Sequence, residues 1–141
     1  IGDESSGGMA VRGHISGKDG IYAAALLVEM LAVTGKSVSE LFAEITAQYG
    51  NPCWAEADFR MTPERKAELQ KLLFTEKRVP EFGTAVDHIS LEDGCKVYFK
   101  NGGWVIARFS GTEPLLRVFC EMDTMENAEK IAKILTEFLS L

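Results

Sequence analysis

The chain of 141 residues contains little that could build a metal centre or a disulfide framework. It has three cysteines and two histidines, no C-x-x-C pair, and aspartates so scattered that no D-x-D arrangement occurs. Zinc, disulfide staples and a magnesium site of clustered aspartates are therefore excluded from this stretch of sequence. An odd number of widely separated cysteines favours a reducing compartment, so we expect a cytoplasmic protein.

Positive charge and long apolar runs are also scarce. Fifteen basic residues face 21 acidic ones, a formal net charge of −6, which disfavours nucleic acid as a partner. The longest mainly apolar stretch, residues 21–33, is interrupted by Glu29 and falls short of the roughly 18–20 residues of a membrane span. No G-x-x-x-x-G-K-[ST] loop and no G-x-S-x-G nucleophile elbow occurs either, so the sequence offers no reacting centre of these kinds.

Two helices are predicted in the first fifty residues. Apolar residues recur at helical spacing over 21–34, after Asp19 as N-cap and before Gly35 as a stop signal. The capping box S-V-S-E, beginning at Ser37, predicts a second helix that ends at a Gly-Asn-Pro sequence. Two helices cannot bury both of their apolar faces alone, so we expect a further partner surface. The glycine-rich residues 1–20 are expected to form a loop.

From Cys53 onward the predicted elements follow the order β-α-β-β-β-β-α. The strands are expected at 54–61, 85–91, 96–100, 104–108 and 115–121. One helix is expected to begin with Thr62 as N-cap and Pro63 at its first position, and the other begins at Thr124. Asp-Gly and Asn-Gly pairs between strands are typical of hairpins. This order predicts an α+β fold, a four-to-five-stranded, mainly antiparallel sheet with two helices on one face. We expect a domain boundary between residues 51 and 52.

The segment between the last two predicted strands has the composition of an anion-binding loop. Residues 108–114, R-F-S-G-T-E-P, place a guanidinium, two hydroxyls and a glycine within five positions. A guanidinium binds phosphate in a bidentate manner, hydroxyls donate hydrogen bonds, and glycine lets backbone N–H groups turn toward an anion. Arg117, on the following strand, is a further candidate. The alternative is an ordinary hairpin connection, which an Arg108 side chain turned away and locked to a carboxylate would favour.

Two segments near the amino end carry further candidates. Residues 3–8, D-E-S-S-G-G, offer a carboxylate and hydroxyls for sugar hydroxyls, or form a mobile terminal loop. Arg12, His14 and Lys18 make a local cationic cluster that either attracts an anion or is solvated loop charge. A lone histidine is more often structural than catalytic, and Asp19 is explained as a helix N-cap.

Three of these segments, in this order, resemble motifs of the α-D-phosphohexomutases, the family of phosphoglucomutase and phosphomannomutase. Residues 108–114 resemble the family's phosphate-binding loop, and E-S-S-G at 4–7 resembles its E-x-S-G sugar-recognition loop. Residues 14–21 resemble the segment that leads into the next helix. The resemblance covers the end of the third of four domains and the whole fourth. It implies that residues 1–51 are a helical remnant of an α/β domain and residues 52–141 a phosphate-binding α+β domain.

The resemblance also implies roles for individual residues. The substrate phosphate would be bound by Arg108, Ser110, Gly111, Thr112 and Arg117. Glu4 and Ser6 would bind sugar hydroxyls, and Lys18 would lie near the reacting phosphate, where it aids proton transfer or neutralises charge. Some members carry a histidine where Gly8 stands here, so the contact from that position is in doubt.

The implied reaction is one that this chain cannot complete. In the family, a phosphoserine donates its phosphoryl group to a hexose 1- or 6-phosphate, the bisphosphate reorients, and the other phosphoryl group returns to the serine. The phosphoserine and the Mg²⁺-binding D-x-D-x-D-R loop belong to earlier domains. We therefore expect a C-terminal portion that binds hexose phosphate and sugar bisphosphate, depends on the missing domains of the same polypeptide, holds no metal, and shows no turnover alone. The choice among glucose, mannose and amino sugars stays open.

The alternative interpretation is a stand-alone, non-catalytic module that senses a phosphosugar. It requires the same phosphate-binding loop but no phosphoserine and no Mg²⁺. The two predicted helices without a partner sheet argue against it, because such a module would have to leave their apolar faces in water.

Overall fold

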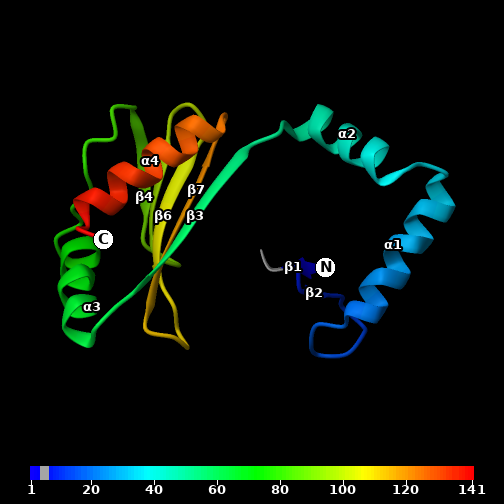
Figure 1. Cartoon of the computed structure of the whole chain (residues 1–141), viewed down its shortest axis with the longest axis horizontal. Coiled ribbons are helices and arrows are strands. Elements are labelled where there is room, and N and C mark those ends of the chain that lie inside the picture. Colours follow the sequence, from blue (N-terminus) through cyan, green and yellow to red (C-terminus); the bar gives the residue numbers. More distant parts are fainter. Residues whose placement is uncertain (4–6) are drawn as a thin grey trace. The chain divides into compact units, whose positions relative to one another are not determined.

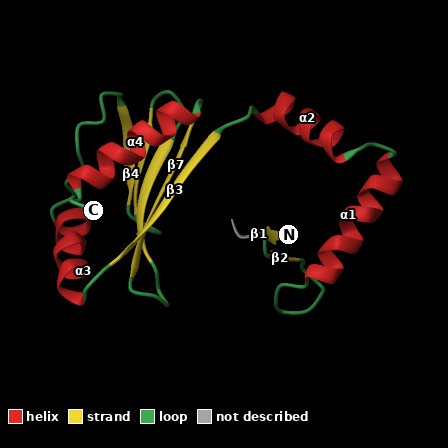
Figure 2. Ribbon diagram, viewed as in Figure 1, coloured by secondary structure: helices red, strands yellow, loops and turns green. Residues whose placement is uncertain are grey.

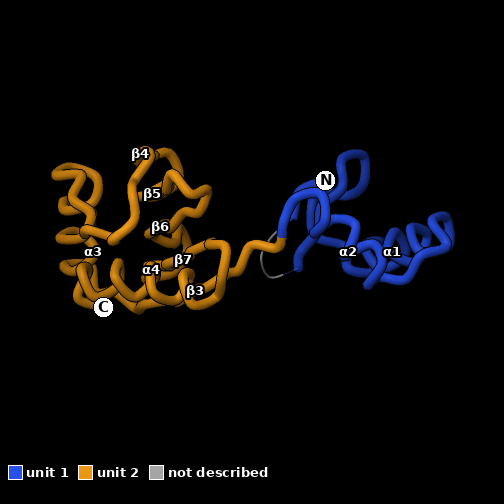
Figure 3. The backbone as a smooth tube through the Cα atoms, turned by 90° about the horizontal axis from the view of Figure 1, so that it is seen from above, with its two compact units in different colours: residues 1–50 blue, residues 51–141 orange. Residues whose placement is uncertain are grey.

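A computed structural model of the whole chain describes residues 1–3 and 7–141. It divides into two compact units, residues 1–50 and residues 51–141, shown in separate colours in Figure 3. The division falls after Gly50, one residue before the boundary expected from the sequence. Each unit is a body with its own secondary structure.

The first unit holds two very short strands and two helices. Strands β1 (Gly2–Asp3) and β2 (Met9–Ala10) pair antiparallel, so the expectation of a loop throughout residues 1–20 is wrong for these four positions. Two-residue strands carry too little alternation to be predicted from sequence. Helices α1 (Gly20–Thr34) and α2 (Val38–Tyr49) follow, as Figure 1 shows.

The helix ends of this unit are those the sequence predicts. The Asp19 carboxylate accepts hydrogen bonds from the backbone N–H groups of Ile21 and Tyr22, at 3.1 and 3.0 Å. Gly35 ends α1 in the left-handed region, with φ 66°, which glycine adopts without strain. Ser37 and Glu40 form the reciprocal capping box at the start of α2. The predicted N-caps are confirmed.

The apolar faces of α1 and α2 are uncovered within this unit. None of their described residues is buried, and Ile21 and Val33 are 87% and 80% exposed. Phe42, Ile45 and Tyr49 on α2 are likewise exposed. Among the described residues, no single helix is long and apolar enough to cross a membrane; α1 and α2 reach that length only as a pair, bent by 84°.

The second unit is a five-stranded antiparallel sheet with helices on one side, the α+β class predicted from the sequence. The strands are β3 (Cys53–Arg60), β4 (Val86–Ser90), β5 (Cys95–Phe99), β6 (Trp104–Phe109) and β7 (Leu115–Met122). Their spatial order is β3-β7-β6-β5-β4. Helices α3 (Pro63–Gln70) and α4 (Met125–Phe138) lie on the same face of the sheet, as Figure 2 shows.

Alternation along the strands separates a buried face from a helix-free face. On β7 every second residue from Leu116 to Met122 is buried, and these residues pack against Ala128, Ile131 and Leu135 of α4. The residues between them point to the side of the sheet without helices. This face, bearing Arg108 and Arg117, carries the candidate site.

Helix α3 continues into a wider turn that the sequence does not predict. Residues Lys71–Thr75 form a π-helical turn, η1, in which the Glu76 N–H donates to the Lys71 carbonyl at 2.9 Å. The extra width occurs where Leu73 is fully buried and Phe74 packs near Phe109, with ring centroids 6.2 Å apart. The N-cap of α3 is Thr62 with Pro63 at the first position, as predicted.

Two of the three thiols are buried, which predicts how readily each cysteine is alkylated. Burial raises the pKa of Cys95 to about 11 and that of Cys120 to about 12, whereas Cys53 is half-buried at the start of β3. Because the thiolate is the reactive form, we expect iodoacetamide at pH 8 to modify Cys53 in the native chain and to spare the other two. Mass spectrometry after a timed reaction, with a urea-unfolded control in which all three react, measures this. Equal rates for the three thiols in the native chain would contradict the fold.

Candidate functional site

Two arginines stand side by side where the central strands end. Arg108 on β6 and Arg117 on β7 are directly paired in the antiparallel register, so their side chains leave the same face of the sheet. Arg108 lies between buried Ala107 and Phe109, which packs against the core, and therefore points to the helix-free face. Two like charges in this arrangement repel each other, and such a pair gains from an anion that lies between or beside them.

The connection between these strands is ordered by its own hydroxyl group. The Ser110 N–H donates to the Leu115 carbonyl at 2.9 Å, and Leu115 N–H donates to the Glu113 carbonyl at 2.8 Å. Ser110 Oγ accepts from the backbone N–H groups of Thr112 and Glu113, at 3.4 and 3.2 Å. These local bonds are those of the ordinary hairpin connection considered above. The loop nevertheless stays open to solvent, and a Cβ added to Gly111 would meet no atom within 4 Å.

Carboxylates accompany both arginines. Arg108 Nε lies 3.3 Å from Asp93 Oδ1. Arg117 Nη2 lies 3.3 Å from Glu113 Oε2, and its Nε lies 3.8 Å from Asp58 Oδ1. Asp93 follows β4 and Asp58 lies on β3, so no local sequence pattern brings them to the arginines. The sequence marks Asp93-Gly94 as a hairpin signal, but its contact with Arg108 depends on strand order.

An Arg108 side chain locked to a carboxylate would favour the alternative of an ordinary hairpin connection, so the strength of the Arg108–Asp93 contact matters. The pair is formed, but the two side chains are 52% and 74% exposed. Exposed ion pairs contribute about 1 kcal/mol or less, so this pair does not lock the guanidinium away from an incoming anion. Phosphate, with its charge and several oxygen atoms, suits the rest of the guanidinium because it accepts two parallel N–H bonds.

The sugar-loop candidates fall in the first unit. Glu4 and Ser6 lie outside the described residues, so their predicted contacts with sugar hydroxyls stay a prediction. The aliphatic chain of Lys18 packs against Gly8, since a Cβ added there would clash with Lys18 Cδ. A larger residue at position 8 therefore requires the lysine side chain to move.

His14 has a structural role at the start of α1. Its Nε2 lies 2.8 Å from Asp19 Oδ2, and its ring stacks on Tyr22 with centroids 3.9 Å apart. The hydrogen bond with His14, followed by the backbone N–H of Tyr22, lowers the pKa of Asp19. A lowered carboxyl pKa stabilises the fold above the ordinary value of 3.8, and this contribution is lost as the pH falls through the lowered pKa. His14 thus supports the N-cap.

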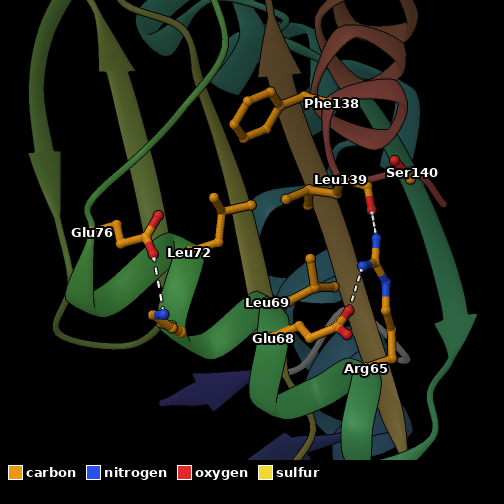
Figure 4. Close-up of a pocket in the computed structure, with 9 residues that line it drawn as sticks. Arg65, Glu68, Leu69, Leu72, Glu76, Phe138, Leu139 and Ser140 are labelled. Carbon is orange, nitrogen blue, oxygen red and sulfur yellow. Dashed lines mark hydrogen bonds and ion pairs between the residues drawn. The ribbon is translucent and has the colours of Figure 1, made fainter.

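A concave surface lies on the helix side of the second unit, away from the arginine pair. It is a cavity of about 300 Å³ between α3, η1 and the end of α4, shown in Figure 4. Arg65 bridges it, with Nη1 lying 2.8 Å from Glu68 Oε2 and Nη2 donating to the Leu139 carbonyl near the end of α4. Lys71 pairs with Glu76 at 3.8 Å. Of these contacts, only the bond from Arg65 to Leu139 joins α3 to the end of α4, and no sequence pattern predicts this cavity.

Metal ligands are not grouped in the part of the chain that the structure describes. No three His, Cys, Asp or Glu side chains within residues 1–3 and 7–141 lie close enough together to hold a metal ion.

Comparison with known proteins gives matches to both units. The family model "Phosphoglucomutase/phosphomannomutase, alpha/beta/alpha domain III" matches residues 1–49, and the "Phosphoglucomutase/phosphomannomutase, C-terminal domain" model matches residues 57–138. A phosphoglucomutase/phosphomannomutase of Thermococcus kodakarensis is 33% identical over 95% of this chain and 27% of its own length. A probable phosphoglucosamine mutase of Methanosarcina acetivorans is 39% identical over 82% of the chain and 25% of its own.

A third relative extends the comparison to a bacterium. The phosphomannomutase/phosphoglucomutase of Pseudomonas putida is 32% identical over 82% of this chain and 23% of its own length. The chain thus spans about a quarter of the length of the curated relatives it matches.

Proposed function

Because this chain belongs to the phosphoglucomutase/phosphomannomutase family, we propose that it is the phosphate- and sugar-binding portion of a phosphohexomutase. The intact enzyme would interconvert hexose 1-phosphate and hexose 6-phosphate through a bisphosphate and a phosphoserine outside this chain. The observation that carries the proposal is the Arg108–Arg117 pair, set on one face of the sheet beside an open Ser-Gly-Thr loop. That arrangement suits a dianionic ester better than an uncharged ligand.

The role proposed for each residue follows from the chemistry of its side chain or backbone. Arg108 and Arg117 neutralise the phosphate of the substrate end that is not reacting, while Ser110, Gly111 and Thr112 donate hydroxyl and backbone hydrogen bonds to it. Glu4 and Ser6 would hold sugar hydroxyls common to both orientations of the bisphosphate. Lys18 would stand near the reacting phosphate. These contacts would serve the reaction because one end of the sugar must be held in place while the other end reacts.

The remaining parts of the mechanism are assigned to other regions of the intact polypeptide. We propose that the phosphoserine donates and regains the phosphoryl group there, and that Mg²⁺, when bound there, neutralises charge on the transferring group. A cytoplasmic location remains part of this proposal, since free, separated cysteines suit a reducing compartment.

The exposed helices of the first unit fit the same proposal. Ile21, Val33 and Phe42 are exposed on α1 and α2, a surface that the rest of an α/β domain would cover. This observation argues against the alternative of a stand-alone phosphosugar sensor, which would have to keep these side chains in water. We therefore favour the enzyme portion over the sensor.

An activity assay with a complementing piece tests the proposal. We expect the 141-residue chain alone to give no interconversion of glucose 1-phosphate and glucose 6-phosphate, because the proposed phosphoserine lies outside it. Addition of a polypeptide carrying the first two domains and the rest of the third, from the Thermococcus kodakarensis relative, is expected to give measurable turnover. Turnover by the chain alone would contradict the proposal. A mixture that assembles, as seen by size-exclusion chromatography, yet stays inactive would contradict it equally.

A further inference from the structure

The connection between β4 and β5 reaches the candidate phosphate site from the side of the neighbouring strand. Gly94 has φ 135°, and a Cβ placed on it would lie 2.9 Å from the Ala107 carbonyl oxygen and 3.2 Å from Arg108 Cβ. Such distances leave no room for a side chain, so the turn backbone lies directly against the end of β6. The preceding residue, Asp93, therefore lies beside Arg108.

The contact that Asp93 makes is specific to one edge of the guanidinium. Its Oδ1 lies 3.3 Å from Nε of Arg108, the nitrogen nearest the strand. A guanidinium held at Nε keeps its outer pair of N–H groups, on Nη1 and Nη2, as the edge that can grip two phosphate oxygens. On the other side, the positive charge of Arg117 repels the Arg108 guanidinium. The negative charge of Asp93 opposes this repulsion.

We propose that Asp93 is a positioning residue for phosphate binding, acting through Arg108 and resting on the proposed function. Asp93 does not touch the ligand. It fixes the guanidinium plane so that less side-chain freedom is lost when phosphate binds. The close fit at Gly94 is what distinguishes this pair from a chance surface ion pair, because the turn cannot shift without disturbing β6.

The test compares two variants of equal charge. Asp93→Asn keeps a polar oxygen beside Arg108 Nε, whereas Asp93→Ala removes it, and both lose the negative charge. We expect the full chain with Asp93→Asn to bind inorganic phosphate about three- to fivefold more tightly than the chain with Asp93→Ala. Titration followed by ¹H–¹⁵N NMR measures both affinities and verifies from the same spectra that each variant is folded.

The Arg108 Nε–H resonance gives a readout that a merely structural role would not move. Its chemical shift is expected to stay closer to that of the unaltered chain in Asp93→Asn than in Asp93→Ala. The matched control is the neighbouring carboxylate Glu92, which makes no ion pair with Arg108 in the described part of the chain. Glu92→Gln and Glu92→Ala should therefore bind phosphate equally.

Each alternative outcome has a distinct meaning. Equal phosphate affinity for the two Asp93 variants, while Arg108→Ala weakens binding, would overturn the role of Asp93 and leave the proposed function standing. A difference in phosphate affinity between the two Glu92 variants as large as that between the Asp93 variants would also overturn the role of Asp93. Any substitution in the turn would then change the affinity to the same extent. No response of the unaltered chain to phosphate would overturn the proposed function together with this inference.

Discussion

Replacement of Arg108 by alanine is expected to weaken binding of inorganic phosphate to the chain by about 10- to 100-fold. A charge-assisted bidentate contact contributes roughly 1.5–3 kcal/mol, and Arg108 is the residue from which the anion-binding loop begins. Isothermal titration calorimetry, or NMR titration where affinity is in the millimolar range, measures the change. Arg108→Lys restores the charge without the planar fork, so we expect it to recover part of the lost affinity and not all of it.

A control for this substitution comes from an arginine elsewhere in the same unit. Arg78, an exposed residue whose Nη1 lies 3.8 Å from Glu76, carries the same charge on the chain after η1. Arg78→Ala is expected to change phosphate affinity by less than about twofold, since exposed charges act weakly over distance in salt solution. Equal losses for Arg78→Ala and Arg108→Ala would mean that net charge, and not the site, governs binding.

Replacement of Leu135 by alanine is expected to lower the free energy of unfolding of the second unit by about 2–5 kcal/mol. Leu135 is 1% exposed and lies in α4 within the core that supports β6 and β7. Loss of its buried methyl groups leaves a cavity that packed neighbours fill only in part. Urea unfolding followed by far-ultraviolet circular dichroism measures the free-energy change.

The same helix supplies the matched control. Lys133 is exposed and its Nζ lies 3.7 Å from Glu137 Oε1, a surface pair of small energy. Lys133→Ala is expected to change the free energy of unfolding by no more than about 0.5 kcal/mol. If Leu135→Ala cost as little as Lys133→Ala, α4 would not be packed on the sheet as described.

Local signals explain why much of the second unit could be predicted from sequence. Thr62 and Thr124 are N-caps in the structure, and their side chains accept from backbone N–H groups three residues later. The strand Leu115–Met122, predicted at 115–121, alternates between buried and half-buried positions. Caps and alternation depend on neighbours within a few residues, so one sequence suffices to find them.

Features that depend on distant contacts could not be found in this way. The π-helical turn at Lys71–Thr75 accommodates the core beneath it, and nothing in its own sequence marks it. The carboxylates of Asp58 and Asp93 reach the arginines from β3 and from the connection before β5, through strand order alone. The residues of the proposed phosphate loop could be singled out because they are contiguous, whereas the carboxylates beside the two arginines come from separate strands and connections.

The central claim is that the connection between β6 and β7 binds the phosphate of a hexose phosphate. Its most direct test is a ¹H–¹⁵N NMR titration of the full chain with glucose 6-phosphate, with unphosphorylated glucose as the matched control. We predict that the backbone amides of Ser110, Gly111 and Thr112 and the Nε–H of Arg108 shift with glucose 6-phosphate and not with glucose. Unmoved loop resonances, with shifts confined to other parts of the chain, would contradict the account.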